Sequence, residues 1–271
     1  MLGAVTLGSG VRGQALDRGV PLRILPLGAS ITWGQGSSDG NGYRGVLRTR
    51  LTAAGIPADM VGSRQHGTMR DNDVEGWPGF RIEQVHEVGE VAASAFLPNV
   101  VLVHAGTNDA VQNMNVSSAG DRMKALLNSV YVSSPNTVII LGTLVVNRNS
   151  RVNELGLEIS RQFVSLAKEL SAEGRRLVVV DMQSDLGPTW DDMDDDTHPN
   201  DAGYQKMAGI WHAGLLQASD QGWLQVPDPA AGNDKPEDRQ EPKSNSAAMS
   251  SAAFHGDRML LSAVVWLLLA R

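Results

Sequence analysis

Ser30 is the residue of this chain best placed for nucleophilic chemistry. It stands where the apolar run 24–27 gives way to a glycine-rich stretch. A tight turn that leaves a buried strand can hold a hydroxyl clear of the backbone, where it can attack an electrophile. Many turn serines, however, only satisfy nearby backbone groups. Ser30 alone therefore indicates a candidate nucleophile, and the rest of the chain must supply its partners.

Asp195 and His198 form a second candidate group. They stand three residues apart, and Pro199 follows the histidine. A serine hydroxyl needs a base that removes its proton during attack, and His198 is suited to that role. Asp195 would hold the imidazole in the correct tautomer, since the short spacing lets both side chains come from one loop. The alternative for His198 is a solvent-facing loop histidine.

Asn108 belongs to a third polar site, in the stretch His104-Ala105-Gly106-Thr107-Asn108-Asp109 after the apolar run 100–103. Asparagine in such a place is most often a turn residue at a strand end. The three polar sites all follow apolar segments. In an open α/β sheet such positions lie at one edge, so the pattern predicts a single pocket there.

The elements that must position these residues alternate between apolar, β-rich segments and segments with helical periodicity. This alternation predicts an α/β fold in three layers, a central five-stranded parallel sheet covered by helices on both faces. The expected strands are residues 23–27, 58–62, 100–104, 137–142 and 176–181. The expected helices are residues 43–54, 82–91, 123–130, 152–170 and 203–216.

Four blocks in order resemble the SGNH (GDSL-type) hydrolase family. They are Gly-x-Ser-Ile-Thr at Ser30, a glycine block at residues 75–79, Gly-Thr-Asn-Asp at 106–109 and Asp-x-x-His-Pro at 195–199. The resemblance covers about residues 22–218, and four ordered blocks are far more specific than one. It implies the flavodoxin-like fold of that family. Residues 71–79 most resemble carbohydrate esterase family 3, the acetyl xylan esterase group.

The resemblance also implies an oxyanion hole, formed by the backbone N–H groups of Ser30 and Gly79 and by the side-chain amide of Asn108. Gly79 suits close backbone approach because it lacks a Cβ. Two positions depart from the family pattern. Ala29 stands where many relatives carry Asp, which puts the support of the serine loop in question. Asp196 stands where relatives often carry Gly, so the loop that bears Asp195 and His198 is expected to bend differently.

Trp33 and Trp77 are the candidate substrate-binding residues. Trp33 follows the nucleophile block and Trp77 lies in the glycine block. Their flat faces are suited to packing against a sugar ring or an acyl chain. The alternative is that both are ordinary core or rim aromatics.

The acidic cluster around Asp195 raises the question of a metal site, since carboxylate oxygens are calcium ligands. It lacks the spacing of a known calcium loop, so a solvated acidic turn is the better interpretation. We expect no metal and no cofactor. The members of the cluster are Asp191, Asp192, Asp194, Asp195 and Asp196.

Composition limits the partners of the chain. The net charge is −7 over 271 residues and there is no cysteine. No basic stripe is available to neutralise phosphates, which argues against a nucleic-acid partner. The lack of cysteine excludes thiol chemistry and a disulfide framework but leaves the compartment open. We expect a monomer that acts on an acylated carbohydrate or another small ester.

Four regions are predicted along the chain: an N-terminal extension at 1–21, a hydrolase domain at 22–226, a flexible polar linker at 227–258 and an apolar tail at 259–271. The twelve apolar residues 259–270 are too few to span a bilayer comfortably. Small residues from Asn245, a polar spacer and an apolar tail have the layout of a glycosylphosphatidylinositol signal, which would tether the protein to a membrane. The alternative is an amphipathic end segment.

The N-terminal residues 1–20 lack a basic region and an apolar core, and make a weak secretory signal. A lipid anchor requires entry to the secretory pathway, so we expect the true start to precede this chain. The leading expectation is a secreted or cell-surface serine esterase that removes acetyl groups from a polysaccharide such as xylan. The alternatives are a lipid or aryl esterase on the same scaffold and a non-catalytic anchored wall protein.

Overall fold

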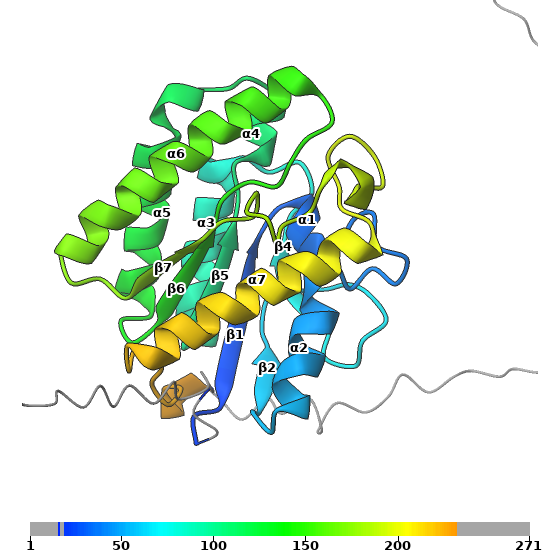
Figure 1. Cartoon of the computed structure of the whole chain (residues 1–271). Helices are drawn as coiled ribbons and strands as arrows, with labels where there is room; N and C mark the ends of the chain where they lie inside the picture. Colours follow the sequence, from blue (N-terminus) through cyan, green and yellow to red (C-terminus); the bar gives the residue numbers. More distant parts are fainter. Residues whose placement is uncertain (1–15, 17–18, 232–271) are drawn as a thin grey trace, which may run out of the picture. The chain divides into compact units, whose positions relative to one another are not determined.

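A mostly parallel sheet forms the centre of the computed structural model, which describes residue 16 and residues 19–231 (Figure 1). Its seven strands within those residues run in the order β3-β4-β1-β5-β6-β7, and β2 also pairs with β1. Only the pairing of β3 with β4 is antiparallel among them. The strands are β1 (Leu22–Gly28), β2 (Ala58–Met60), β3 (Arg64–Gln65), β4 (Asp73–Gly76), β5 (Val100–His104), β6 (Val138–Gly142) and β7 (Leu177–Val180).

The α/β architecture and the five predicted strands are confirmed, but the sheet is larger than expected. Both β2 and β4 pair with β1 on the side away from β5, β2 along Leu22–Ile24 and β4 along Leu27–Gly28. The additional strands β3 and β4 have two and four residues. Such short strands, with polar residues such as Asp73 and Glu75, give no apolar pattern that a sequence analysis could detect.

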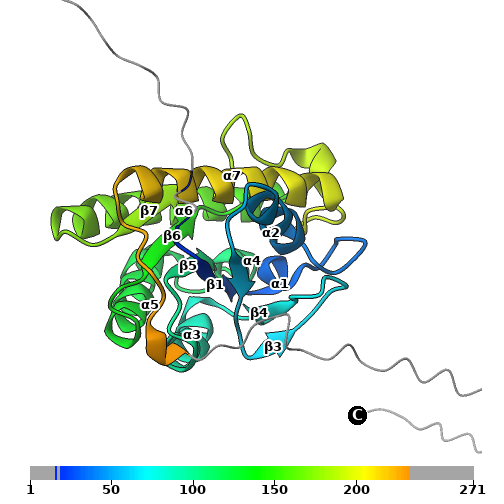
Figure 2. The same cartoon turned by 90° about the horizontal axis from the view of Figure 1, so that it is seen from below.

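Helices cover both faces of the sheet (Figures 1 and 2). One buried cluster contains side chains of α2 and α7, and the other contains side chains of α3, α5 and α6. The five predicted helices are confirmed, whereas the short α1 and α4 were not predicted. The helices are α1 (Ser30–Trp33), α2 (Tyr43–Ala53), α3 (Ile82–Phe96), α4 (Thr107–Val111), α5 (Ala119–Ser133), α6 (Ser150–Ala172) and α7 (Asp201–Asp220), with 3₁₀ turns η1 (Val116–Ser118), η2 (Trp190–Asp192) and η3 (Pro229–Ala231).

Strand β1 shows why apolar runs become strands here. Ile24 belongs to the cluster on the α2 and α7 side, and its neighbour Leu25 to the cluster on the other side. Successive side chains of a strand point to opposite faces, so a strand that is covered on both faces must be apolar at nearly every position. All seven residues of β1 are buried.

Asn99 ties the segment before β1 to the segment after α7. Its side-chain Nδ2 donates hydrogen bonds to the carbonyls of Pro21 (2.8 Å) and Gln225 (2.7 Å). Leu16 and Leu224 are both buried in the cluster on the α2 and α7 side. Leu16 and Pro21, which precede the predicted domain start at residue 22, thus contribute to the packed unit.

Several predicted segments lie outside the described residues. The chain divides into a compact unit at Met1–Pro236 and a second unit at Glu237–Arg271. None of the second unit is described, and neither are residues 1–15. The glycosylphosphatidylinositol signal, most of the polar linker and most of the N-terminal extension therefore fall outside the described part. Within residues 19–231, no helix is long and apolar enough to cross a membrane.

Candidate active site

Ser30 lies at the carboxyl edge of the sheet. Strand β1 ends at Gly28, and Ser30 opens the four-residue helix α1. The turn between them is tight, because a Cβ at Gly28 would lie 2.3 Å from both the carbonyl oxygen of His104 and Oγ1 of Thr32. Only glycine can occupy such a position, and this close approach brings the end of β1 against the end of β5.

The structure brings Ser30, His198 and Asp195 together although 168 positions separate the first two along the chain. Nε2 of His198 lies 2.9 Å from Oγ of Ser30, and Nδ1 lies 2.7 Å from Oδ2 of Asp195. In the tautomer protonated on Nδ1, the imidazole donates to Asp195 and accepts from the Ser30 hydroxyl. This is the hydrogen-bonded geometry that activates a serine nucleophile.

Asp195 makes three hydrogen bonds within this group. Its Oδ1 accepts from the backbone N–H groups of Thr197 and His198, both at 2.7 Å, and its Oδ2 accepts from the His198 ring. Burial by itself would raise the pKa of Asp195, but these hydrogen bonds together lower it below its ordinary value. The carboxylate is thus held ionised while its side chain remains 51% exposed.

The loop that carries Asp195 and His198 is fastened to the segment after β6. The backbone N–H of Arg148 donates to the carbonyl of Asp196 (2.9 Å), and Nδ2 of Asn147 donates to Oγ1 of Thr197 (3.0 Å). Asp196, the departure from the family pattern, therefore contributes a backbone carbonyl to this contact. The loop still places Asp195 against His198, as the spacing predicts.

The rest of the acidic cluster does not gather around one point. Asp192 accepts from Nζ of Lys206 (2.6 Å) and from Oγ1 of Thr189 (2.7 Å), which together lower its pKa although burial alone would raise it. Asp195 faces His198 instead. Among the described residues, no group of three or more His, Cys, Asp or Glu has the arrangement of a metal site.

Gly79 lies in a turn that leaves its N–H open. Phe80 N–H donates to the carbonyl of Trp77 (3.1 Å), and Gly79 has φ +86°. These features, with Pro78 in the second position, are those of a type II turn, whose third residue requires a positive φ. A Cβ at Gly79 would meet no protein atom within 4 Å. The positive φ thus favours glycine here, whereas no neighbouring protein atom excludes a side chain.

Asn108 is joined to this same turn. Its Nδ2 donates to the carbonyl of Phe80 at 2.9 Å. A primary amide has two N–H groups, so one remains available to a ligand. Ser30 also has an open backbone N–H, because the first residues of a helix have no acceptor within the helix. The structure thus offers three donors on elements that meet at the carboxyl edge of β1 and β5.

Asp109 links the Asn108 segment to helix α3, a role that the sequence analysis missed. Its Oδ2 accepts from the backbone N–H of Ile82 (3.1 Å), and its Oδ1 pairs with Nη1 of Arg122. The side chain is fully buried, and burial raises the pKa of Asp109 despite these contacts. Because Ile82 follows the Gly79 turn closely, this contact fixes the turn relative to Asn108.

Arg44 is the second residue that the sequence analysis missed. It is fully buried, and burial lowers its pKa. Its guanidinium lies 3.0–3.2 Å from five backbone carbonyls, those of Thr32, Trp33, Gly40, His66 and Asn72. One side chain thereby joins the segment after Ser30 to the segment before β4. Its sequence position, in the first turn of an amphipathic helix, gives no sign of this role.

Planar side chains lie against both Trp33 and Trp77. Trp33 stacks on His66 with ring centroids 4.1 Å apart, and the guanidinium carbon of Arg64 lies 4.0 Å from the Trp33 centroid. Two planar groups this close to one centroid must occupy opposite faces, since they would overlap on the same face. Trp77 contacts Arg64 and Phe80 in a similar way. Both faces of Trp33 therefore carry protein groups, while packing of either indole against a sugar ring or an acyl chain stays a prediction.

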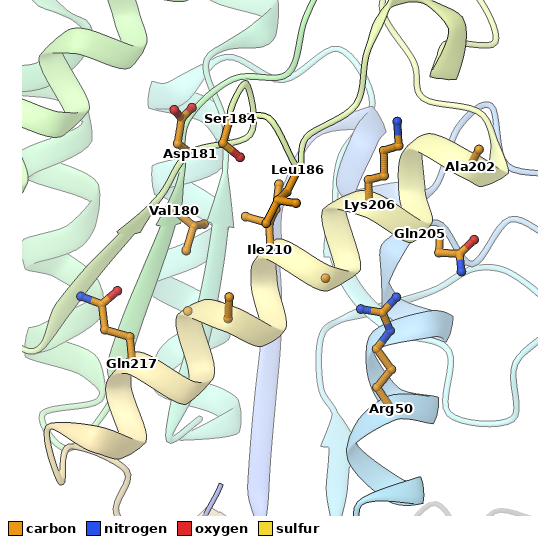
Figure 3. Close-up of a pocket in the computed structure, with 13 residues that line it drawn as sticks. Arg50, Val180, Asp181, Ser184, Leu186, Ala202, Gln205, Lys206, Ile210 and Gln217 are labelled. Carbon is orange, nitrogen blue, oxygen red and sulfur yellow. The ribbon is translucent and has the colours of Figure 1, made fainter. Parts of the chain in front are cut away.

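A groove of about 650 Å³ runs along α7, between the end of β7 and Arg50 of α2 (Figure 3). Val180, Leu186 and Ile210 contribute apolar side chains to it. None of Ser30, Asp195, His198, Gly79 and Asn108 lines this groove. It is therefore a feature separate from the candidate active site.

The comparisons with known proteins agree with this geometry. The model of the GDSL-like lipase/acylhydrolase family matches residues 27–206. A protein described as "Multidomain esterase" from Ruminococcus flavefaciens is 26% identical over 238 residues, which are 73% of this chain and 29% of that protein. The chain thus spans less than a third of the length of this curated relative.

Solved structures with the same fold include two carbohydrate esterases of family 3. The one from Clostridium thermocellum has a TM-score of 0.64 and 24% identity and covers 76% of this chain and 100% of its own. The one from Talaromyces cellulolyticus has a TM-score of 0.65 and 22% identity and covers 74% and 99%. These structures show a shared fold, and the family match extends over most of the described residues and includes Ser30, Asn108, Asp195 and His198. The chain belongs to the GDSL-like lipase/acylhydrolase family, the SGNH hydrolases.

Proposed function

We propose that this chain is a serine esterase that hydrolyses O-acyl esters, with acetyl as the acyl group and a polysaccharide such as xylan as its carrier. The observation that carries the proposal is the hydrogen-bonded series from Asp195 through His198 to Ser30. Support for acetyl and for a carbohydrate comes from the structural neighbours, which include family 3 carbohydrate esterases and an acetyl esterase solved with an acetate ion.

In the first step, Oγ of Ser30 attacks the carbonyl carbon of the ester while its proton moves to Nε2 of His198. The 2.9 Å separation of these atoms allows direct transfer. Asp195 stabilises the imidazolium that forms, because its Oδ2 lies 2.7 Å from Nδ1. The ester C–O bond then breaks, and His198 returns the proton to the departing sugar hydroxyl. An acyl-serine remains.

The tetrahedral intermediate carries a negative charge on the former carbonyl oxygen. The donors available to it are the N–H groups of Ser30 and Gly79 and the second amide N–H of Asn108. Donors that are held in place before the charge develops cost no reorganisation during the reaction. The hydrogen bond from Asn108 to Phe80 contributes to this rigidity, since it joins two of the three donor segments.

In the second step, a water molecule attacks the acyl-serine. Nε2 of His198 takes the water proton, and the same oxyanion donors stabilise the second tetrahedral intermediate. Its collapse breaks the bond to Oγ of Ser30, returns the proton to that oxygen and releases the carboxylic acid. The cycle needs only residues of this chain and water, so it balances without a metal ion or a cofactor.

An acyl-length and polysaccharide panel tests the proposal on the purified protein. Hydrolysis of 4-nitrophenyl acetate, butyrate and octanoate is compared with acetate release from acetylated xylan, with Ser30→Ala as the blank. We expect acetate to be preferred and xylan to be deacetylated. A preference for octanoate would favour a lipid or aryl esterase. Failure of a fluorophosphonate to label Ser30 in the wild type, together with no turnover, would show a non-catalytic protein.

A further inference from the structure

Five planar groups form a continuous stack beside the candidate active site. In order, they are His66, Trp33, Arg64, Trp77 and Phe80, and we refer to them as the Arg64 stack. The outer pairs are nearly parallel, with interplanar angles of 20° for Trp33 and His66 and 17° for Trp77 and Phe80. Arg64 lies between the two indoles, 4.0 Å from the Trp33 centroid and 4.4 Å from the Trp77 centroid.

The two indoles belong to the two segments that carry the Ser30 nucleophile and the Gly79 N–H donor. Trp33 is the last residue of α1, and Ser30 is the first. One turn of helix therefore separates the nucleophile from the stack. Trp77 opens the turn that presents the Gly79 N–H, and Phe80 closes it. We refer to α1 as the nucleophile helix and to residues 77–80 as the oxyanion turn. Within the Arg64 stack, Arg64 alone separates Trp33 of the nucleophile helix from Trp77 of the oxyanion turn.

Hydrogen bonds hold the central members in place. Nη1 of Arg64 donates to the carbonyl of Gly76 at 2.8 Å, and Nε1 of Trp77 donates to Oε1 of Glu75 at 2.6 Å. Gly76 pairs with Gly28, at the end of the strand that leads to Ser30. Arg64 is therefore anchored to the backbone beside the nucleophile as well as to both rings.

His66, at the end of the stack beyond Trp33, is also held by polar contacts. Nδ1 of His66 lies 2.9 Å from the carbonyl of Trp33 and 3.0 Å from that of Gly40. Arg44 bonds to the carbonyls of Trp33 and His66, so both residues share a second anchor. Because His66, Arg64 and Trp77 are each fixed in this way, the distances between the rings of the stack have little freedom to change.

We propose that Arg64 is a positioning residue, a planar spacer that sets the distance between the nucleophile helix and the oxyanion turn. The inference rests on the proposed esterase function. Arg64 acts through Trp33 and Trp77 and does not touch the reacting atoms. It should therefore affect the rate of the chemical step, which depends on the Gly79 donor, far more than the binding of substrate.

The guanidinium is suited to this task because it is flat and cationic. It can lie parallel to an aromatic ring on each of its faces while its edge donates hydrogen bonds. A lysine ammonium carries the charge but has no plane, and a methionine side chain fills volume but has neither the charge nor the plane. These differences let substitutions separate the shape of Arg64 from its charge.

The test compares Arg64→Met and Arg64→Lys with the wild type on 4-nitrophenyl acetate, together with the rate of fluorophosphonate labelling of Ser30. Arg175→Met is the matched control, because Arg175 also lies over an aromatic ring, that of Tyr131, at 5.2 Å in an unrelated part of the fold. We expect kcat and the labelling rate to fall about 10-fold to 100-fold in both Arg64 variants, as for other displacements of about 1 Å. KM should change less than threefold, and Arg175→Met should keep wild-type kcat.

Arg64→Ala provides a second test, since it leaves an open slot between Trp33 and Trp77. Added guanidinium ion at a concentration too low to unfold the protein should restore part of the lost kcat, whereas the same concentration of ammonium ion should not. This rescue also separates positioning from a general loss of stability, which guanidinium would worsen.

Three results would overturn the proposal: wild-type kcat in Arg64→Met, full activity in Arg64→Lys, or a loss that appears in KM alone. Full activity in the lysine variant would show that charge, and not the planar spacer, matters. If the wild type itself neither hydrolyses esters nor reacts with the fluorophosphonate, the proposed function fails instead. The two failures are therefore distinguishable.

Discussion

Asp195→Asn is the substitution whose consequence follows most directly from the site geometry. The side-chain oxygen of the new amide can still accept from the N–H groups of Thr197 and His198, so the loop should keep its shape. The new NH₂ group, however, would face Nδ1 of His198 at the present position of Oδ2. Nδ1 must then accept a hydrogen bond, which moves the ring proton to Nε2. An Nε2 that already carries a proton cannot take one from Ser30.

The expected size of this effect is bounded by two considerations. The equivalent exchange in a serine protease, where the acid is buried, lowers kcat about 10⁴-fold. The Asp195 side chain is 51% exposed, so water can partly compensate for the lost carboxylate. We therefore expect kcat to fall about 10²-fold to 10⁴-fold, which corresponds to a barrier increase of about 3 to 5 kcal/mol.

The assay is kcat and kcat/KM on 4-nitrophenyl acetate, with thermal unfolding to show that the variant is folded. Asp194→Asn and Asp196→Asn are matched controls, since both residues contribute backbone groups to the loop: the N–H of Asp194 donates to the carbonyl of His198 (2.8 Å), and the carbonyl of Asp196 accepts from Arg148. Both should keep kcat within about threefold of the wild type. A loss of less than threefold in Asp195→Asn, or a larger loss in Asp196→Asn, would refute the assignment of the orienting acid.

Three other predictions follow from the same structure. Ser30→Ala and His198→Ala should each lower kcat by orders of magnitude, and the double variant should be little worse than either, because they act as one unit; additive losses would contradict this. Asn108→Ala should lower kcat about 100-fold with little change in KM, since its amide is needed when charge develops on oxygen; an unchanged kcat in folded protein would show that it only ties the turn. Burial lowers the pKa of His104 to about 4, below its unfolded value of about 6.5. As the pH falls from about 6.5 to about 4, the unfolded state takes up the proton first, so the free energy of unfolding should decrease by up to about 3 kcal/mol. Urea unfolding at pH 7 and pH 4 should show a smaller decrease in His104→Asn than in the wild type; an equal decrease would exclude His104 as the cause.

The sequence by itself determined the five longer helices, five of the strands and the candidate residues of the reaction. Strands buried on both faces must be apolar at nearly every position, so β1, β5 and β6 are visible as continuous apolar runs. The helices show their periodicity for a similar reason. Ser30, Asp195 and His198 are detectable because the reaction requires particular residue types at particular element ends, in blocks that the family shares.

The tertiary structure alone decided how distant segments meet. Arg44 bonds to carbonyls that any residue type would provide, so no sequence pattern marks its partners. Arg64 of the two-residue strand β3 and His66, which follows that strand, lie against Trp33, and a strand this short shows no periodic pattern in the sequence. Local sequence patterns indicate which residues are buried, because buried positions recur with the period of the helix or the strand. Contacts between side chains far apart in the chain have no period, and only the folded backbone brings them together.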